Sequence, residues 1–315
     1  MNKSVFIYRK EWIRNVFWVG MRRVIGRSRF KRSKYYGEKI GDYYDANRRI
    51  ADGILGDKPF LACRFGDAEL RTVVYALENK LGIRKGFPDY IRKKMSVCAG
   101  FFKTDDENML KFGDLFLSCC KEIDVIGVWY NLMEDYIIHN FAPNAHCVEL
   151  DGLAPYMTDI PWSAALKGKK VLVIHPFKDS IEKQYAKRKL LFPGTDVLPE
   201  FELHTLKAVQ TSCGEASKFK DWFCALDYMF DEAMKIDFEV AIIGCGAYGF
   251  PLAAKLKAAG KKVVHMGGVT QMLFGIAGNR WLDRPESKFI NENWCKPQES
   301  ERPENASDVE GACYW

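Results

Sequence analysis

The sequence predicts an α/β fold, built as a Rossmann-like, doubly wound and mostly parallel sheet with helices on both faces. Short apolar runs alternate with longer amphipathic segments along most of the chain, which is typical of strands that alternate with helices. The runs 171–174 and 240–243 are apolar at every position, as expected of strands covered on both faces. Turns at the ends of such strands are where these sheets bind ligands.

The individual elements follow from these patterns. Strands are expected at 60–65, 124–129, 146–150, 170–175, 240–244 and 262–266. Helices are expected at 42–55, 67–80, 105–121, 178–190, 218–236, 248–259 and 270–278. The 315 residues then divide into a basic amphipathic leader (1–36), a single α/β catalytic domain (37–295) and a flexible polar tail (296–315).

The leader concentrates positive charge. Residues 1–36 hold eleven lysines and arginines and one acid, Glu11, whereas the remaining residues hold 36 bases and 40 acids. The apolar run of this segment is too short to span a bilayer, and the segment lacks the cleavage site of a signal peptide. One interpretation is a helix in the plane of an anionic membrane surface, with Trp12, Phe17, Trp18 and Val19 toward the lipid. The alternative is a loosely ordered leader.

The cysteines indicate a reducing compartment. None of the ten forms a CxxC pair or a cluster with zinc-ligand spacing, and many stand inside apolar runs. We therefore expect a cytoplasmic protein, peripheral on the inner membrane face if the leader binds lipid. We expect no nucleic-acid partner.

An acidic loop follows the first expected strand. Arg64 ends that strand, Gly66 permits a tight turn, and Asp67 and Glu69 open the next helix. Two carboxylates beside phosphate oxygens and water suit Mg²⁺ or Mn²⁺. The same two acids also suit any helix start, where Asp caps the helix and Glu interacts with its dipole.

The string Arg64-Phe65-Gly66-Asp67-Ala68-Glu69 resembles the Arg-Phe-Gly-Asp-Gly-Glu motif of the GT-D-type glycosyltransferases, with Ala68 in place of the second glycine. The blocks 171–180 and 240–268 are similar to two further blocks of that family, so the resemblance covers about 58–295. It implies that Asp67 and Glu69 hold a metal, Mn²⁺ or Mg²⁺, against the diphosphate of a nucleotide-sugar. It implies that Arg64 and Gly66 lie beside them.

A second loop, after the strand expected at 170–175, offers Lys178, Asp179 and Ser180 for phosphate or sugar contacts. The alternative is that Asp179 or Ser180 only caps the following helix.

A third loop contains Gly244-x-Gly246-x-x-Gly249 between a strand and a helix, which is a complete dinucleotide fingerprint. The backbone there can face the phosphate of a nucleotide-sugar or of NAD(P), or can form only a packing turn. The next strand ends at His265 where an NAD-binding unit has an acid. Gly267 and Gly268 follow and permit close approach to a ligand. His265 is either a base or ribose contact or a structural histidine.

These features together predict a metal-dependent glycosyltransferase that moves a sugar from a nucleotide-diphosphate donor to a glycan or lipid-linked acceptor in surface polysaccharide or glycoprotein biosynthesis. Asp67, Glu69 and Arg64 are the expected catalytic residues, and Asp179, Asp227 and His265 are candidates for a base. The alternatives are an NAD(P)-dependent oxidoreductase using the Gly244 turn and a non-catalytic nucleotide-sugar-binding scaffold.

Overall fold

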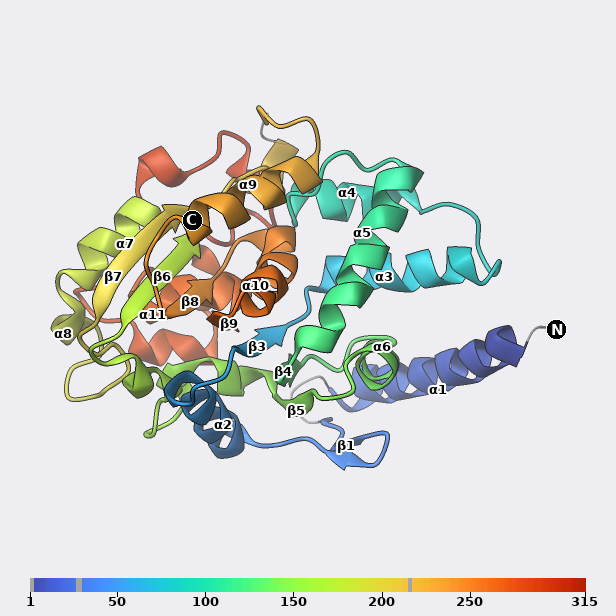
Figure 1. Cartoon of the computed structure of the whole chain (residues 1–315), viewed down its shortest axis with the longest axis horizontal. Helices are drawn as coiled ribbons and strands as arrows, with labels where there is room; N and C mark the ends of the chain where they lie inside the picture. The colour runs from blue at the N-terminus through green and yellow to red at the C-terminus, as the bar shows by residue number, and fades with distance from the viewer. Residues whose placement is uncertain (1–2, 27–29, 215–216) are drawn as a thin grey trace.

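The computed structural model describes residues 3–26, 30–214 and 217–315. At its centre is a seven-stranded sheet of order β5-β4-β3-β9-β8-β6-β7, in which every pair of neighbours is parallel (Figure 1). The prediction of a Rossmann-like, doubly wound sheet is confirmed. Along the chain, β3, β4 and β5 follow one another toward one edge of the sheet, and the chain then crosses over to β6. The strand order therefore reverses near β3 and β9.

The strands of the large sheet are β3 (Phe60–Arg64), β4 (Val125–Val128), β5 (His146–Glu149), β6 (Lys170–His175), β7 (Glu202–Lys207), β8 (Val240–Ile243) and β9 (Lys262–His265). A separate antiparallel hairpin pairs β1 (Lys34–Tyr35) with β2 (Glu38–Lys39).

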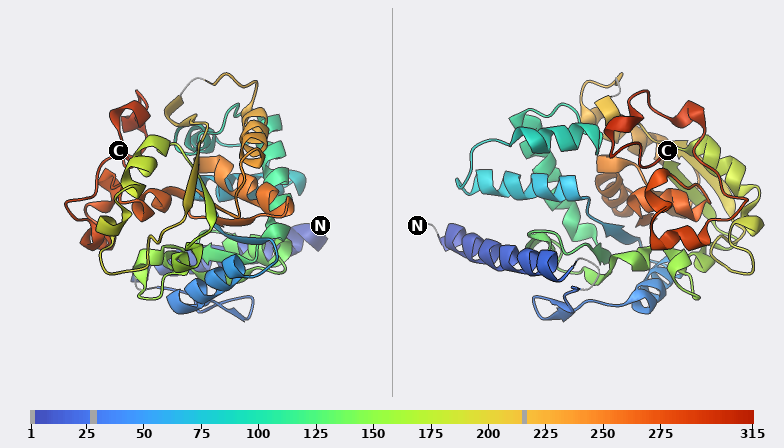
Figure 2. Two further views of the ribbon diagram at one scale, coloured as in Figure 1. Left: turned by 60° about the vertical axis from the view of Figure 1, so that its left-hand side comes forward. Right: turned by 180° about the vertical axis from the view of Figure 1, so that it is seen from behind.

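The helices are α1 (Lys3–Ile25), α2 (Tyr43–Leu55), α3 (Asp67–Lys80), α4 (Asp89–Val97), α5 (Asp106–Cys119), α6 (Glu134–Phe141), α7 (Lys178–Tyr185), α8 (Arg188–Leu191), α9 (Trp222–Met234), α10 (Gly249–Ala258) and α11 (Thr270–Leu273). Helices lie on both faces of the sheet, as the two views of Figure 2 show.

Alternation along the central strands explains why both faces are apolar. In β6, Leu172 and Ile174 enter the core shared with α3, α5, α9 and α10, whereas Val171 and Val173 enter the core shared with α2, α7 and α11. Successive side chains of a strand point to opposite faces, so a strand buried twice must be apolar throughout.

The sequence patterns do not predict the strands β1, β2 and β7 or the helices α4 and α6. β7 is an edge strand with exposed ends and half-buried middle residues, so its sequence, ELHTLK, lacks the apolar run of a central strand. The helices α4 and α6 are short, at 9 and 8 residues, so their apolar periodicity is weak in the sequence.

The leader forms a regular helix, α1, for most of its described part. Trp18 and Val19 are half-buried, with Trp18 packed on Phe30, so the prediction that these two residues face lipid is wrong. Residues 1–2 and 27–29 of the predicted leader lie outside the described residues.

The structure also differs at 296–315, where the sequence predicts a flexible polar tail. Val309, Cys313 and Trp315 are buried in the core beside α7 and α11, and Glu301 is buried as well. A few apolar residues are scattered among the polar residues of this segment, at intervals that match neither a strand nor a helix. Within the described residues, no helix is long and apolar enough to cross a membrane.

Candidate functional site

The main cleft of the molecule opens at the carboxyl ends of the parallel strands. It has a volume of about 680 Å³ and is reached by Arg64 at the end of β3, Trp129 after β4, His175 of β6, Gly244 after β8 and His265 of β9. This is the edge where strand order reverses, which is the usual ligand site of an open α/β sheet.

Positive charge dominates the wall of the cleft. Only Asp67, Glu69 and Glu310 line it as side-chain carboxylates among the described residues. The cations that line it are Arg22, Arg23, Arg64, Arg71, Lys94, Arg280 and Arg284. A wall of this charge favours an anionic ligand.

Arg64, at the end of β3, lies in the cleft wall with the Glu69 carboxylate nearby. Its Nε donates to the carbonyl oxygen of Phe65 at 3.2 Å, and the guanidinium lies over the Trp129 ring at 4.6 Å from the ring centroid. No ion pair of the described residues includes Arg64, and burial lowers the pKa of its guanidinium. A partly desolvated cation of this kind is stabilised by an anion that arrives from the cleft.

Asp67 occupies the first turn of α3 and already has cationic neighbours. Its Oδ1 accepts from Arg71 Nε at 3.0 Å, and Lys94 Nζ lies 3.4 Å from Oδ2. The N-cap of α3 is Gly66 and not Asp67, so the expectation that Asp67 caps this helix is wrong. Its carboxylate instead faces the cleft, with the side chain 35% exposed.

Glu69 folds back over Gly66. A Cβ added at Gly66 would lie 2.0 Å from Glu69 Oε2 and 2.3 Å from Oε1, so a larger residue there would displace this carboxylate. Burial raises the pKa of Glu69, and the nearby Arg64 guanidinium opposes that rise. Glutamate at the third position of a helix commonly turns back in this way, so the local geometry serves the helix start as well as the cleft.

These two carboxylates provide a limited site for a divalent metal. The described residues contain no group of three or more His, Cys, Asp or Glu side chains that could hold an ion. Mg²⁺ and Mn²⁺ are nevertheless bound in many enzymes by one or two carboxylates together with substrate phosphates and water. The residues present fit such a metal only if a bound phosphate completes its coordination.

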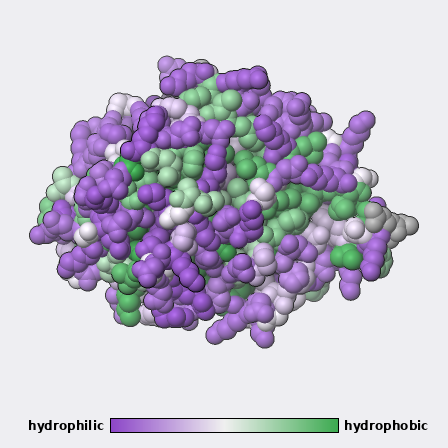
Figure 3. Space-filling view, in the orientation of Figure 1, coloured by the Kyte–Doolittle hydropathy of each residue, from purple (hydrophilic) through white to green (hydrophobic). Residues whose placement is uncertain are grey.

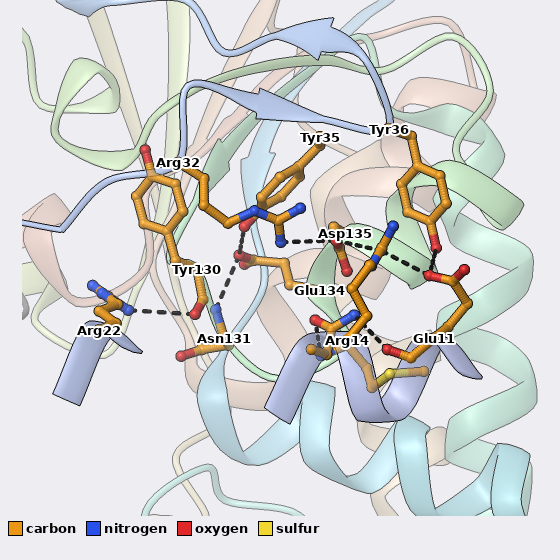
Figure 4. A network of polar contacts seen from close by, with 12 residues as sticks. Glu11, Arg14, Arg22, Arg32, Tyr35, Tyr36, Tyr130, Asn131, Glu134 and Asp135 are labelled. Atoms are coloured by element: carbon orange, nitrogen blue, oxygen red, sulfur yellow. Dashed lines mark hydrogen bonds and ion pairs between the residues drawn. The ribbon is translucent and has the colours of Figure 1, made fainter. Parts of the chain in front are cut away.

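The loop between β4 and α6 (residues 129–133) forms the wall opposite α3. Tyr130 and Met133 have φ of 60° and 64°, a conformation that side chains rarely adopt. The carboxylate of Glu134 holds the loop by accepting the backbone N–H of Trp129 at 2.9 Å. It also accepts the backbone N–H of Asn131 at 3.3 Å (Figure 4). Trp129 Nε1 and Asn131 Nδ2 are buried donors with no acceptor among the residues that the structure describes.

Glu134 is fully buried, and burial raises its pKa to about 7, although hydrogen bonds from the loop and from Tyr35 favour its charged form. The neighbouring Asp135 accepts from Arg14 of α1 at 2.7 Å and from Arg32 at 2.8 Å (Figure 4). The loop is therefore held in position by charged groups that do not line the cleft.

Lys178, Asp179 and Ser180 do not line the cleft. Glu301 of the C-terminal segment accepts the backbone N–H groups of Asp179 at 2.8 Å and Ser180 at 3.2 Å, and also the Ser180 hydroxyl. Lys178 pairs with Glu182 at 2.9 Å. The amino terminus of α7 is thus occupied by the protein's own carboxylate, and the loop contributes to the cleft only through His175, Pro176 and Phe177.

The glycines of the Gly244–Gly249 turn mostly permit close packing against neighbouring residues. A Cβ at Gly244 would lie 2.6 Å from the carbonyl oxygen of Gly267, and one at Gly249 would overlap the His265 ring. Gly246 faces the cleft with φ of 57°, but Ala99 O accepts the adjacent Ala247 N–H at 2.8 Å. This N–H is therefore not available to a phosphate, which weakens the NAD(P) interpretation of the fingerprint.

The turn after β9 combines close packing with access to the cleft. Gly267 has φ of 66° and brings its backbone against the Arg64 guanidinium, whereas Gly268 lies under the Tyr314 ring. His265 is buried, its Nδ1 is 3.2 Å from Ile243 O, and burial lowers its pKa to about 3. A histidine in this state is neutral and a weak base, which favours the structural interpretation.

Neither of the other candidate bases lines the cleft. Asp227 pairs with Lys255 on the surface, and Asp179 lies at the start of α7 outside the cleft. Burial also lowers the pKa of His175 to about 3.

Both ends of the chain contribute residues that were not predicted. Arg22 and Arg23 come from α1, and Arg280, Tyr314 and Trp315 come from the C-terminal part. Within the C-terminal part, Arg280 Nη1 donates to the Tyr314 hydroxyl at 2.8 Å. In the sequence, the Tyr-Trp pair in an otherwise polar stretch is the signal that this segment packs on the body, because isolated aromatic residues favour burial.

Comparison with known proteins gives few matches. No family model and no curated protein matches the chain. A solved structure described as the highly conserved domain of unknown function 1792 with a distinct glycosyltransferase fold has a TM-score of 0.43. The selenomethionine-substituted structure of that domain has a TM-score of 0.41. Each is 12% identical in sequence, and the match covers 84% of this chain and 92% of the other. We therefore infer function from the cleft itself.

Proposed function

We propose that this protein is a glycosyltransferase whose cleft binds the diphosphate of a nucleotide-sugar donor. The observation that carries the proposal is Arg64, a partly desolvated guanidinium in a cationic cleft that forms no ion pair among the described residues. The resemblance of residues 64–69 to the GT-D motif supports the choice of a sugar donor over other phosphorylated ligands.

Several residues of the cleft would each contribute to binding the donor. Arg64 donates to phosphate oxygens and stabilises the charge that develops on the leaving diphosphate. The Trp129 ring and the turn at Gly267 lie close to the Arg64 guanidinium and would limit its movement. Asn131 Nδ2 and Trp129 Nε1 are unsatisfied donors that can serve the sugar hydroxyls or the nucleotide after a small movement.

Asp67 and Glu69 are the residues that would hold Mg²⁺ or Mn²⁺. Two acids at the start of α3 repel an anion that approaches the helix amino terminus, and this repulsion is removed when a divalent ion lies between them and a diphosphate. The metal would act as a Lewis acid for the leaving group. Arg71 and Lys94, which now contact Asp67, would then turn toward the phosphate.

Thermal unfolding in the presence of UDP, GDP, uridine or NAD⁺, each with and without MnCl₂, tests donor binding. We expect UDP or GDP to stabilise the protein, more so with Mn²⁺, because a ligand at about 100 times its Kd adds about 2.7 kcal/mol. The double variant Asp67→Asn/Glu69→Gln should lose the Mn²⁺ effect. The matched control Asp57→Asn/Glu38→Gln removes two exposed carboxylates outside the cleft and should retain it.

Stabilisation by NAD⁺ alone would contradict the proposal and support an oxidoreductase. Release of nucleotide from UDP- or GDP-sugars separates an enzyme from a scaffold, because a scaffold binds without release. A Mn²⁺ effect that survives Asp67→Asn/Glu69→Gln would show that the metal site lies elsewhere.

A further inference from the structure

The helix α1 is attached to the body by one face only. Tyr8 donates to Glu78 of α3 at 3.2 Å, and Asn15 Oδ1 accepts the Met133 N–H at 3.0 Å. Arg14 reaches Asp135 of α6. Tyr8 and Asn15 are the buried residues of α1, and they lie seven positions apart, on one side of the helix.

The opposite side of α1 is apolar and exposed. Phe6, Ile13, Phe17 and Val24 are 56%, 65%, 59% and 86% exposed. Their spacings of seven, four and seven residues place them in one line along the helix. We call these four residues the apolar stripe. Trp12 and Val16, also exposed, widen it on one flank. Figure 3 shows apolar surface among polar surface at the end of the molecule where α1 lies.

Basic residues border the apolar stripe. Lys3, Arg9, Lys10 and Arg23 are exposed. The acid of this helix, Glu11, is turned toward the body, where its carboxylate accepts from the Tyr36 hydroxyl at 2.6 Å and contacts Arg14 at 2.8 Å. The outer surface of α1 therefore carries basic residues and large apolar side chains, whereas Glu11, the acid of the helix, is turned away from it.

We propose that α1 lies in the plane of an anionic lipid surface, with the apolar stripe among the acyl chains and the basic residues at the headgroups. A helix with bulky apolar side chains between lysines and arginines matches such a surface in both hydrophobicity and charge. A second copy of the chain fits less well, because two stripes brought together would also bring their flanking cations together without acids between them.

The end of α1 connects this surface to the cleft. Val19, Arg22 and Arg23, in the last two turns of the helix, line the cleft. Arg22 Nη1 donates to Trp129 O at 2.6 Å, so the helix also contacts the loop that carries Trp129. A helix bound to a membrane would hold the cleft beside the lipid surface. The further step, that the acceptor is lipid-linked, rests on the proposed function, whereas the docking of α1 does not.

Sedimentation of the full chain with vesicles tests the docking. We expect the protein to bind vesicles of phosphatidylcholine with about 30% phosphatidylglycerol and to bind phosphatidylcholine alone at least about tenfold less, since each basic residue near an anionic surface adds affinity. The variant Ile13→Ser/Phe17→Ser should weaken binding to the anionic vesicles at least about tenfold. Both side chains are solvent-exposed, so the fold should be kept.

The matched control is Leu55→Ser/Ile160→Ser, which removes two exposed apolar side chains that are 62% and 67% exposed outside α1. This control should bind as the unmodified protein does. Equal binding to both kinds of vesicle, or binding unchanged by Ile13→Ser/Phe17→Ser, would overturn the proposal. Absence of vesicle binding, together with self-association that the same variant abolishes, would assign the stripe to an interface between copies. Neither result depends on a sugar donor, so they are distinct from failure of the proposed function.

Discussion

At the scale of single residues, Arg64 differs from Arg71 and Arg280 of the cleft in its surroundings. Arg71 and Arg280 have carboxylates within ion-pair distance, namely Asp67 and Glu310, whereas Arg64 has the ring of Trp129 and backbone atoms. The charge of the nearby Glu69 offsets part of the desolvation of Arg64, and no ion pair among the described residues offsets the rest. A ligand anion in the cleft would do so, which is the role proposed for Arg64.

The variant Arg64→Met should therefore separate binding from stability. We expect UDP or GDP affinity to fall about 10- to 100-fold, since hydrogen bonds to charged groups contribute about 1.5–3 kcal/mol. The free energy of unfolding should change by less than about 1 kcal/mol, because methionine has a similar length and needs no anion. Calorimetric titration and urea unfolding measure the two quantities.

The control Arg302→Gln removes an exposed cation outside the cleft and should alter neither quantity. If Arg64→Met unfolded far more easily and bound nucleotide as before, Arg64 would be a structural residue.

Glu134 is the second residue for which the structure predicts a measurable effect, namely a change of stability with pH. Burial raises its pKa to about 7 from an ordinary value of 4.5. The folded protein then keeps the proton at pH values where the unfolded chain has released it. The stability that this proton adds is complete below about pH 4.5 and is lost as the pH rises through 7.

Urea unfolding between pH 5 and pH 8 compares the protein with Glu134→Gln, whose amide oxygen can still accept from the 129–133 loop. Relative to this variant, the unmodified protein should lose up to about 3 kcal/mol as the pH rises. Tyr35, Arg14, Arg32 and Asp135 face the same region and are common to both proteins. Parallel pH profiles would show that Glu134 titrates normally.

At the scale of elements, the amino-terminal helix belongs to the site. α1 and the segment before β1 supply Arg14 and Arg32, and both bind one buried carboxylate, Asp135 of α6 (Figure 4). Asp135 also follows directly after Glu134, whose carboxylate holds the loop at residues 129–133. The position of the leader and the shape of the cleft wall are thus linked.

The variant Asp135→Asn should loosen this link. It leaves two arginines without their shared carboxylate, and breaking a buried ion pair in this way costs about 3 kcal/mol or more. We expect a loss of that size in urea unfolding and faster proteolysis within α1. Asp237→Asn, which removes an 80% exposed partner of Lys170, should leave both unchanged. Equal effects of the two variants would mean that Asp135 does not anchor α1.

At the scale of the whole molecule, the cleft collects charge from distant parts of the chain. Arg22 and Arg23 of α1, and Arg280 and Arg284 near the carboxyl end, face the same cavity as Arg64 of β3. The chain beyond residue 36 carries more acids than bases, yet the cleft has seven cationic side chains and three carboxylates in its wall. Folding has concentrated positive charge where a ligand would bind.

This concentration predicts a dependence on ionic strength. Raising NaCl from about 50 mM to about 500 mM shortens the range of electrostatic attraction and should weaken UDP or GDP binding several-fold. Binding of uridine, which has the same base and ribose without phosphate, should respond much less. Titration calorimetry at the two salt concentrations measures both. Equal salt sensitivity of uridine and UDP would exclude the cationic wall as the phosphate site.

Much of the architecture could be read from local patterns. The doubly apolar runs at 171–174 and 240–243 became central strands of a parallel sheet, and the segment 67–80 became α3 at those bounds. These patterns depend on burial within a few residues along the chain. β7 escaped detection because an edge strand is buried less, and 178–180 could not be excluded because Glu301, which covers it, is 121 residues away.

The sequence by itself determined the class of fold, the acidic loop at the start of α3 and the strongly basic leader, because each is set by neighbouring residues. Only the tertiary structure decided which residues meet. It brought α1 and the carboxyl-terminal segment to the cleft, left Lys178, Asp179 and Ser180 outside it, and placed Arg64 in the cleft wall without an ion pair among the described residues. Such contacts join residues far apart in the chain, and no periodicity within a segment encodes them.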